Sequence, residues 1–484
     1  MFFKKHDTFI ASDSTIPLLC QPSACNPKRQ IITTVTTVRD ENFKPISNFE
    51  TMLHLLKGNI GTGLFAMPGA FQNAGLWTGS VLTIITACIC THCMHILVTS
   101  AAILQKRKGH EVSVSYADVA EIAFQTGSQQ FVKHAKLARV LVSLFICVTQ
   151  LGFCCVYVVF ASTNLKQVVD YYAPHLQWDV RQFMCLVTIP LIFLNWLRDL
   201  KLLAPVSLLA NILQSISIVI VFYYIARDGL PPMDSTPAFN NWIGVSLFFG
   251  TVVFSFEGIG LILPIQKDMR HPRDFEGWNG ILNVAMILVT CLALAMGFYG
   301  YLKYGAEIQG SITLNLPQDE MYALLFVFYR LQHAITLHLI TKVLLNYYRL
   351  ARLVKVFMVL AIFGSYTMQF YVPIPILWPV LEKKIETFNK HPLVSELMFR
   401  TLLVLLTLSL AAAIPKIDLY ISLVGAMTGS LLALIFPPIL EIVTCWPDVS
   451  KMAIVKNFLI VIFGLTGFTS GTYASIKKIL SPTT

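Results

Sequence analysis

The stretch Leu53–Trp77 reads LHLLKGNIGTGLFAMPGAFQNAGLW, and it decides the fold. It is long and apolar enough to cross a bilayer, because a membrane helix needs roughly 20 residues. Its middle nevertheless carries Gly58, Gly61 and Gly63, and each glycine lowers helix stability by about 1 kcal/mol relative to alanine. Unwound backbone inside a membrane must line a cavity or be buried in protein. The sequence therefore predicts a helix broken at its glycines, whose second half starts with free amides that bind a carboxylate.

The predicted halves are residues 52–60 and 64–77, although the same glycines would also suit an unbroken span that packs closely against its neighbours. A second interrupted span decides between these interpretations. The span 242–265 carries Glu257 near its centre, followed within three residues by two glycines. Two broken spans, five spans apart, are typical of an inverted repeat of five plus five helices, and such breaks mark the substrate site of secondary transporters.

The composition indicates a membrane protein. The chain has 484 residues, of which 55% are hydrophobic and 13% charged, and its mean hydropathy is +0.66. Since a soluble chain carries about 25% charged residues, we expect an all-α polytopic membrane protein with about 11 transmembrane helices. Lys and Arg concentrate in the N-terminal tail and in the loops after the even-numbered spans, which predicts a cytoplasmic N-terminus.

The chain divides into three expected parts. Residues 1–50 are rich in Ser, Thr, Pro and Lys and are expected to be a disordered cytoplasmic tail. Residues 51–476 form the transmembrane domain, and 477–484 a short C-terminal tail. The expected spans are 53–77, 78–104, 137–164, 183–197, 202–226, 242–265, 279–302, 353–372, 396–414, 419–443 and 453–476.

Five long motifs occur in order through the membrane region: HLLKGNIGTGLFAMPGAFQNAG, FSFEGIGLILPIQKDM, SITLNLPQ, VLAIFGSYTMQFYVP and LVGAMTGSLLALIFPPILEI. In these the sequence resembles the proton-coupled amino acid transporter family of the amino acid/auxin permease group. The resemblance implies a LeuT-like 5+5 inverted repeat with broken helices 1 and 6 and one extra C-terminal helix. It also implies proton-coupled symport of small neutral amino acids such as glycine, alanine and proline.

Two ionisable residues are candidates for proton coupling. The resemblance assigns that role to a histidine early in the first span, here His54, and Glu257 lies beside the second break. An ionisable residue inside a membrane is costly and by default functional, and histidine titrates nearest physiological pH. A structural hydrogen bond from His54 and a structural brace by Glu257 are the alternatives. His92 and His95 are weaker candidates.

A zwitterionic substrate suggests a division between the breaks, with the carboxylate on the first and the amine on the second. The predicted substrate-binding residues are Gly61, Thr62, Gly63, Ser255, Phe256, Glu257 and Gly258. Possible ion-binding or pocket-lining residues are Asn59, Ser365, Tyr366 and Gln369. No metal site and no cofactor other than the proton are expected, and the expected partners are amino acids, protons and the lipid bilayer, not nucleic acid.

Residues 321–350 form an atypical insertion, because the family pattern runs from SITLNLPQ almost directly into the next span. The insertion is either a surface or re-entrant helix or a gene-model artefact. Two other functions stay open: an amino acid sensor with a transporter fold, and a sodium-coupled or vesicular carrier. An enzyme is not expected, because the glycines of the first span do not form a GxGxxG loop after a strand, and the sequence has no nucleophile–base set or Walker pattern. The plasma membrane and the lysosomal membrane are both compatible.

Overall fold

The computed structural model describes residues 45–108, 115–198, 200–317, 350–384, 392–481. These residues form helices, with one isolated β-bridge between Ile46 and Met269. The α-helices are α1 Asn48–Asn59, α2 Thr62–Ala74, α3 Leu76–Lys108, α4 Tyr116–Thr126, α5 Gln129–Val132, α6 Ala135–Tyr172, α7 Val180–Asn195, α8 Leu200–Arg227, α9 Trp242–Ser255, α10 Ile259–Asp268, α11 Ile281–Tyr304, α14 Leu350–Tyr371, α15 Ile374–Lys384, α17 Pro392–Ala413, α18 Ile417–Val424, α19 Phe436–Cys445 and α20 Lys451–Leu480. A π-helix, η5 Gly425–Ile435, joins α18 to α19, and short 3₁₀ turns are η1 Met233–Ser235, η2 Pro272–Phe275, η3 Gly305–Glu307 and η4 Ile312–Asn315.

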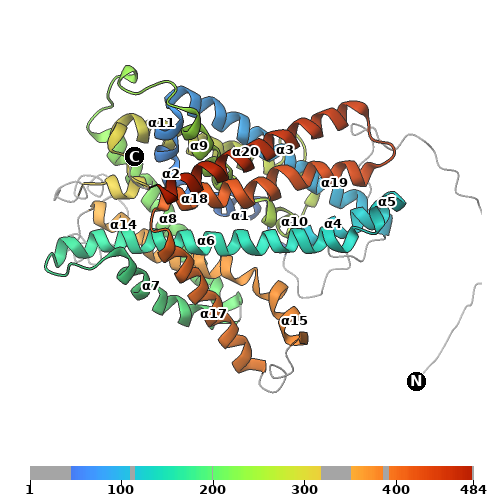
Figure 1. Cartoon of the computed structure of the whole chain (residues 1–484), viewed down its shortest axis with the longest axis horizontal. Coiled ribbons are helices and arrows are strands. Elements are labelled where there is room, and N and C mark those ends of the chain that lie inside the picture. Colours follow the sequence, from blue (N-terminus) through green and yellow to red (C-terminus); the bar gives the residue numbers. More distant parts are fainter. Residues whose placement is uncertain (1–44, 109–114, 199, 318–349, 385–391, 482–484) are drawn as a thin grey trace, which may run out of the picture.

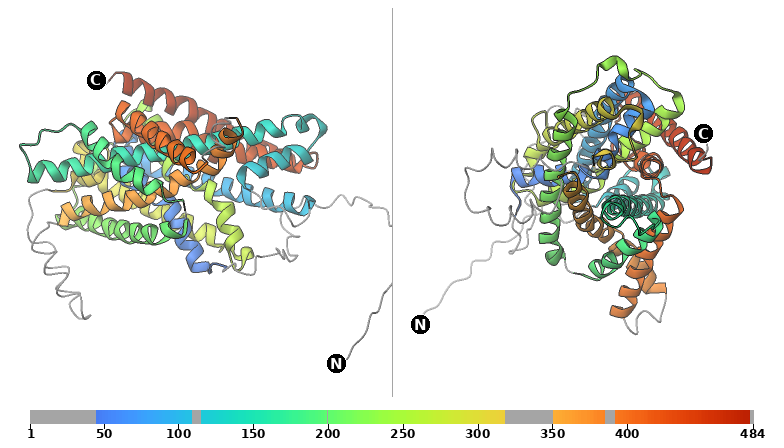
Figure 2. Two further views of the ribbon diagram at one scale, coloured as in Figure 1. Left: turned by 90° about the horizontal axis from the view of Figure 1, so that it is seen from below. Right: turned by 90° about the vertical axis from the view of Figure 1, so that its left-hand side faces the viewer.

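Most of the long helices lie roughly along one axis, with α6 running the length of the bundle, whereas α7 and α17 are inclined to it (Figure 1). The right-hand view of Figure 2 looks along this axis and shows many helices end-on. Within the described residues, nine helices are long and apolar enough to cross a membrane. The predicted all-α polytopic class is therefore confirmed. Taken singly, α1 with 12 residues, α2 with 13 and the apolar helix α7 with 16 are shorter, so the count of eleven spans stays a prediction.

Both predicted breaks are present. A capping box between Ser47 and Glu50 starts α1, which ends at Asn59. The next two residues have extended backbone, and Gly61 is the N-cap of α2. The second break also separates two helices by a short non-helical segment, since α9 ends at Ser255 and α10 begins only at Ile259.

The second half of the first span ends earlier than the sequence predicts. Gly75 has a φ of +99°, and the chain turns there from α2 into α3. A β-carbon at this position would lie 2.6 Å from the Ala238 carbonyl oxygen, so the corner needs both the left-handed conformation and the absent side chain. Trp77 therefore belongs to the next helix.

The ends of the domain also differ slightly from the prediction. The helix α1 begins at Asn48, inside the predicted tail 1–50, and α20 continues to Leu480. Residues 1–44 and all of the predicted insertion except Leu350 lie outside the described residues.

Candidate functional site

The two breaks face each other. A β-carbon at Gly63 would lie 2.6 Å from the Ser255 hydroxyl oxygen, and one at Gly58 would lie 2.8 Å from a methyl carbon of Leu261. The helix α1 thus lies beside α10, and α2 lies beside α9. The broken helices therefore cross antiparallel, with their unwound segments at the same level.

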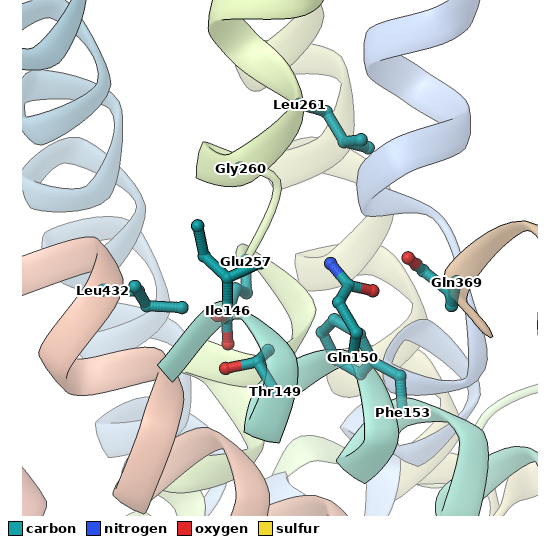
Figure 3. A pocket seen from close by; sticks show the side chains of 9 residues that line it. All are labelled: Ile146, Thr149, Gln150, Phe153, Glu257, Gly260, Leu261, Gln369 and Leu432. Atoms are coloured by element: carbon teal, nitrogen blue, oxygen red, sulfur yellow. The ribbon is translucent and has the colours of Figure 1, made fainter. Parts of the chain in front are cut away.

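A small cavity lies against the second break (Figure 3). Its lining residues are Ile146, Thr149, Gln150, Phe153, Glu257, Gly260, Leu261, Gln369 and Leu432. They come from α6, the second break, α10, α14 and η5. The cavity has a volume of about 20 Å³, which accommodates about one water molecule. In this conformation it is too small for an amino acid, so substrate binding requires the surrounding helices to move apart.

Glu257 is the charged residue of this cavity. Its side chain is 8% exposed, and neither carboxylate oxygen accepts a hydrogen bond within the part of the chain that the structure describes. The Thr149 side chain lies beside it (Figure 3). On the opposite side, a β-carbon at Gly429 would lie 2.5 Å from the Oε2 atom of Glu257. The π-helix η5 therefore leaves room for the carboxylate by carrying a glycine there.

Unpaired acceptor atoms gather around both breaks. Among the described residues, the buried oxygens without a hydrogen-bond partner include Asn59 Oδ1, Thr62 Oγ1, Thr149 Oγ1 and Gln150 Oε1. The Asn59 side chain touches the second break, since a β-carbon at Gly258 would lie 2.8 Å from its Oδ1. Buried polar groups are normally satisfied, so a cluster of free acceptors suits a ligand that donates hydrogen bonds, such as an ammonium group.

The structure brings some of the predicted residues together and separates others. Asn59, Glu257 and Gln369 lie at the cavity or between the breaks. Ser255 donates its hydroxyl to the Thr251 carbonyl, and Phe256 is fully buried. Tyr366 does not line the cavity, because its hydroxyl lies 2.7 Å from Thr407 Oγ1 on α17. Ser365 is half-buried on α14 and is not among the cavity-lining residues.

The predicted histidines lie outside the cavity. His54 is exposed on α1, with Glu50, Lys57 and Asp268 as its charged neighbours. His92 is exposed on α3, and the His95 ring lies 2.7 Å from Asn283 Oδ1. The role of His54 in coupling stays a prediction. Within the described ranges, no group of three or more His, Cys, Asp or Glu residues could hold a metal ion.

Among the site residues that the sequence analysis missed are two polar ones, Thr149 and Gln150, and the glycine Gly429. A signal for the first two was present, because they are adjacent polar residues inside an apolar span. The position of Gly429 opposite Glu257 depends on long-range packing, for which the sequence has no local signal.

Two broken membrane helices whose unwound segments face each other, with a buried carboxylate and a cavity beside one of them, are typical of secondary transporters. The chain belongs to the family of transmembrane amino acid transporter proteins, whose sequence profile matches residues 44–348 and 338–477. It is thus a multi-pass membrane transporter and not an enzyme.

Similar proteins extend over most of the chain. The Drosophila melanogaster "proton-coupled amino acid transporter-like protein pathetic" is 33% identical over 443 residues, which cover 91% of this chain and 87% of that protein. The Caenorhabditis elegans "probable amino acid transporter skat-1" is 27% identical over 448 residues, 90% of each chain. Among solved structures, Mhp1, a nucleobase-cation-symport-1 family transporter, matches 92% of this chain and 93% of its own at 12% identity, with a TM-score of 0.46. MhsT in complex with L-phenylalanine matches 85% of this chain and 98% of its own at 14% identity, with a TM-score of 0.44.

Proposed function

We propose that this protein is a secondary active transporter that carries small neutral amino acids, such as glycine, alanine and proline, together with protons by alternating access. The observation that supports this most is the buried Glu257 carboxylate among unpaired acceptor atoms between two broken helices. The name of the Drosophila relative, a proton-coupled amino acid transporter-like protein, supports the choice of coupling ion.

The two breaks suit the two ends of a zwitterion. The first turn of α2 presents backbone amides at Thr62 and Gly63, which suit the substrate carboxylate together with the positive end of the helix dipole. The acceptor oxygens of Asn59, Thr149 and Gln150 suit the ammonium group. Small side chains fit this arrangement because the surrounding cavity is tight.

Glu257 carries the proton. Burying an ionised carboxylate without a partner is costly, and the closed conformation buries this one. Protonation removes the charge, so it favours closure around the substrate. Uptake therefore rises as the outside pH falls. His54 is a second candidate coupling group, on the half of the first span that would face the cytoplasm.

The site of action is the plasma membrane or the lysosomal membrane, with the N-terminus in the cytoplasm. The excess of Lys and Arg in the loops that would be cytoplasmic supports this orientation.

The test is uptake of radiolabelled glycine, alanine and proline by cells that express the full chain, at acidic and neutral outside pH and with sodium replaced by choline. The decisive variant is Glu257→Gln, which is permanently neutral and nearly isosteric. We expect it to lose pH dependence and net accumulation but to retain exchange of labelled for unlabelled amino acid. His54→Ala and deletion of residues 321–350 test the other two predictions.

Each other outcome contradicts a specific part of the proposal. Loss of exchange in Glu257→Gln at normal surface level would mean that the carboxylate binds the ammonium group rather than the coupling proton. Uptake that requires sodium would show that sodium, and not the proton, is the coupling ion. If surface-localised wild-type protein transports none of the three amino acids, transport of this class fails and an amino acid sensor becomes the better hypothesis.

A further inference from the structure

Two buried cations lie on α14, far from the cavity. Lys355 is 1% exposed, and its Nζ atom makes no hydrogen bond within the described part of the chain. Arg352, one turn earlier, is 3% exposed. A buried charge is normally paired, because its desolvation is otherwise uncompensated. A cation buried in a membrane protein therefore indicates a function, and the transport cycle described above does not use these two.

Arg352 is held against α6. Its guanidinium carbon lies 3.4 Å from the centre of the Tyr171 ring and 5.0 Å from that of Tyr172. Stacking of this kind fixes a guanidinium group in place. Lys355 lies one turn further along α14 and is buried in the bundle.

The packing of α14 on α6 shows which residues of α6 lie beside Lys355. The two helices are antiparallel, since Tyr366 lies beside Cys154 whereas Arg352 lies beside Tyr171. Lys355, three residues after Arg352, therefore lies near the level of Gln167. The Oε1 atom of Gln167 is also buried without a partner, and so is the Oδ1 atom of Asn164 one turn away on α6.

The seam between α6 and α14 that holds these groups also borders the cavity further along both helices. Lys355 and Gln369 are fourteen residues apart on α14, which is close to four turns, so they lie on the same face about 20 Å apart. Phe153 and Gln167 have the same spacing on α6. Phe153 and Gln369 both line the cavity. The unpaired groups around Lys355 therefore lie on the same helix faces as the cavity, at the end of the bundle where α14 begins.

Two acids described at this end already have partners. Asp170 pairs with Lys166, and Asp228 pairs with Arg227 and, at 3.4 Å, with Lys303. The hydrogen bond from Arg227 holds the pKa of Asp228 below its usual range, so this carboxylate is charged and engaged at neutral pH. Within the described residues, none of these carboxylates pairs with Lys355, so its positive charge suits a ligand anion.

We propose that Lys355, with Arg352 beside it, is a recognition site for the carboxylate group of the incoming amino acid on its way to the cavity. Opening of the seam between α6 and α14 exposes the ammonium group, and closure buries it again. The identity of the carboxylate as that of a transported amino acid rests on the proposed function. Carboxylate binding itself does not.

The first test uses purified full-length protein in detergent and acetate, a carboxylate without an ammonium group. Thermal unfolding is measured in sodium acetate and in sodium chloride at equal concentration, because a ligand of the folded state raises the midpoint. We expect acetate to raise the midpoint of the wild type. Lys355→Gln should lose this shift and Lys355→Arg should keep it. Lys166→Gln, the matched control, removes a partly exposed lysine at the same end and should also keep it.

Three results would overturn the proposal: no acetate shift in the wild type, a shift that survives in Lys355→Gln, or a larger shift with chloride that Lys355→Gln abolishes. The last result would identify a halide site. Lys355→Gln protein that does not fold is replaced by Lys355→Met, which keeps the length and apolar stem of the side chain.

The second test is uptake kinetics. Loss of one charged hydrogen bond predicts a KM about tenfold higher in Lys355→Gln, with little change in Vmax and partial recovery in Lys355→Arg. An unchanged KM would contradict the role in substrate recognition. If the wild type transports no amino acid, the proposed function fails, and the acetate experiment still decides whether the site binds a carboxylate.

Discussion

The two breaks carry the same residue type and use it differently. Gly58 and Gly63, at the first break, each face an atom of the second broken helix at less than 3 Å from the position of a β-carbon. Gly260, just after the second break, has nothing within 4 Å of that position. Close approach at the breaks thus involves Gly58 and Gly63 on the first broken helix and Gly258 on the second, whereas Gly260 leaves space beside the cavity. Glycines that look equivalent in a sequence can serve close approach in one place and open space in another.

The breaks also differ in charge. The unwound segment at the first break, between Asn59 and Gly63, has no ionisable side chain. The second holds Glu257, with acceptors from α6 around it. In our proposal the first break therefore binds with backbone amides, and the second region responds to protons and to the substrate ammonium group. Substitutions at the first break should affect packing, and those around the second should affect affinity and pH dependence.

The largest effect is expected from Gly63→Ala. The added methyl group would lie 2.6 Å from the Ser255 hydroxyl oxygen and 3.1 Å from the Ser255 α-carbon. Because backbone must move, overpacking should cost about 1–3 kcal/mol and reduce uptake at least tenfold. Surface level and thermal stability of the purified protein are measured together with uptake. Gly69→Ala, on the same helix, is the matched control, because its β-carbon would lie at an ordinary contact distance of 3.5 Å from the Gln309 carbonyl oxygen. It should retain wild-type uptake, and equal losses in both variants would contradict the packing argument.

A smaller effect is expected from Gln150→Leu, which keeps the size of the side chain but removes its unpaired acceptor. Hydrogen bonds to charged groups contribute about 1.5 kcal/mol at the lower end of their range, so the KM for glycine should rise about tenfold while protein stability is unchanged or improved. The control is Gln214→Leu, whose amide instead donates to the Ile60 carbonyl at the first break. That change should lower thermal stability and leave the KM less affected. The reverse pattern would mean that the ammonium group binds elsewhere.

Local signals in the sequence were sufficient to predict the breaks, because glycines weaken a membrane helix and a carboxylate inside it is costly. Glu257 was identified in this way and lies at the second break, and Asn59, predicted as a possible ion-binding or pocket-lining residue, touches that break. Tyr366 illustrates the limit: it is polar and follows the family motif, but its hydroxyl turns toward Thr407 on a neighbouring helix. The direction of a side chain in a bundle depends on which helices surround it, and one sequence does not contain that information.

The π-helix η5 is a second feature that local reasoning could only partly predict. The sequence predicts an ordinary membrane span over residues 419–443, but not eleven residues of π-helix within it. A β-carbon at Gly425 would overlap with the Gly250 carbonyl on α9, and Gly429 lies against Glu257. Close approach to the second broken span therefore accounts for both glycines. π-Helical segments are frequent at functional sites, which agrees with this position beside the carboxylate.

The smallest effect is expected from Gly429→Ala, which sharpens the contrast between packing and proton binding. The methyl group would lie 2.5 Å from Glu257 Oε2 and 2.9 Å from a methyl carbon of Val253. Both neighbours are ends of side chains, which move more easily than backbone, so uptake at acidic pH should fall only about two- to fivefold. The methyl group would also displace water from the ionised carboxylate and so favour its protonated form. The pH of half-maximal uptake should therefore move upward, as measured by uptake between pH 5 and 8. An unchanged pH profile with reduced uptake would show that Gly429 serves packing alone and would weaken the assignment of the coupling proton to Glu257.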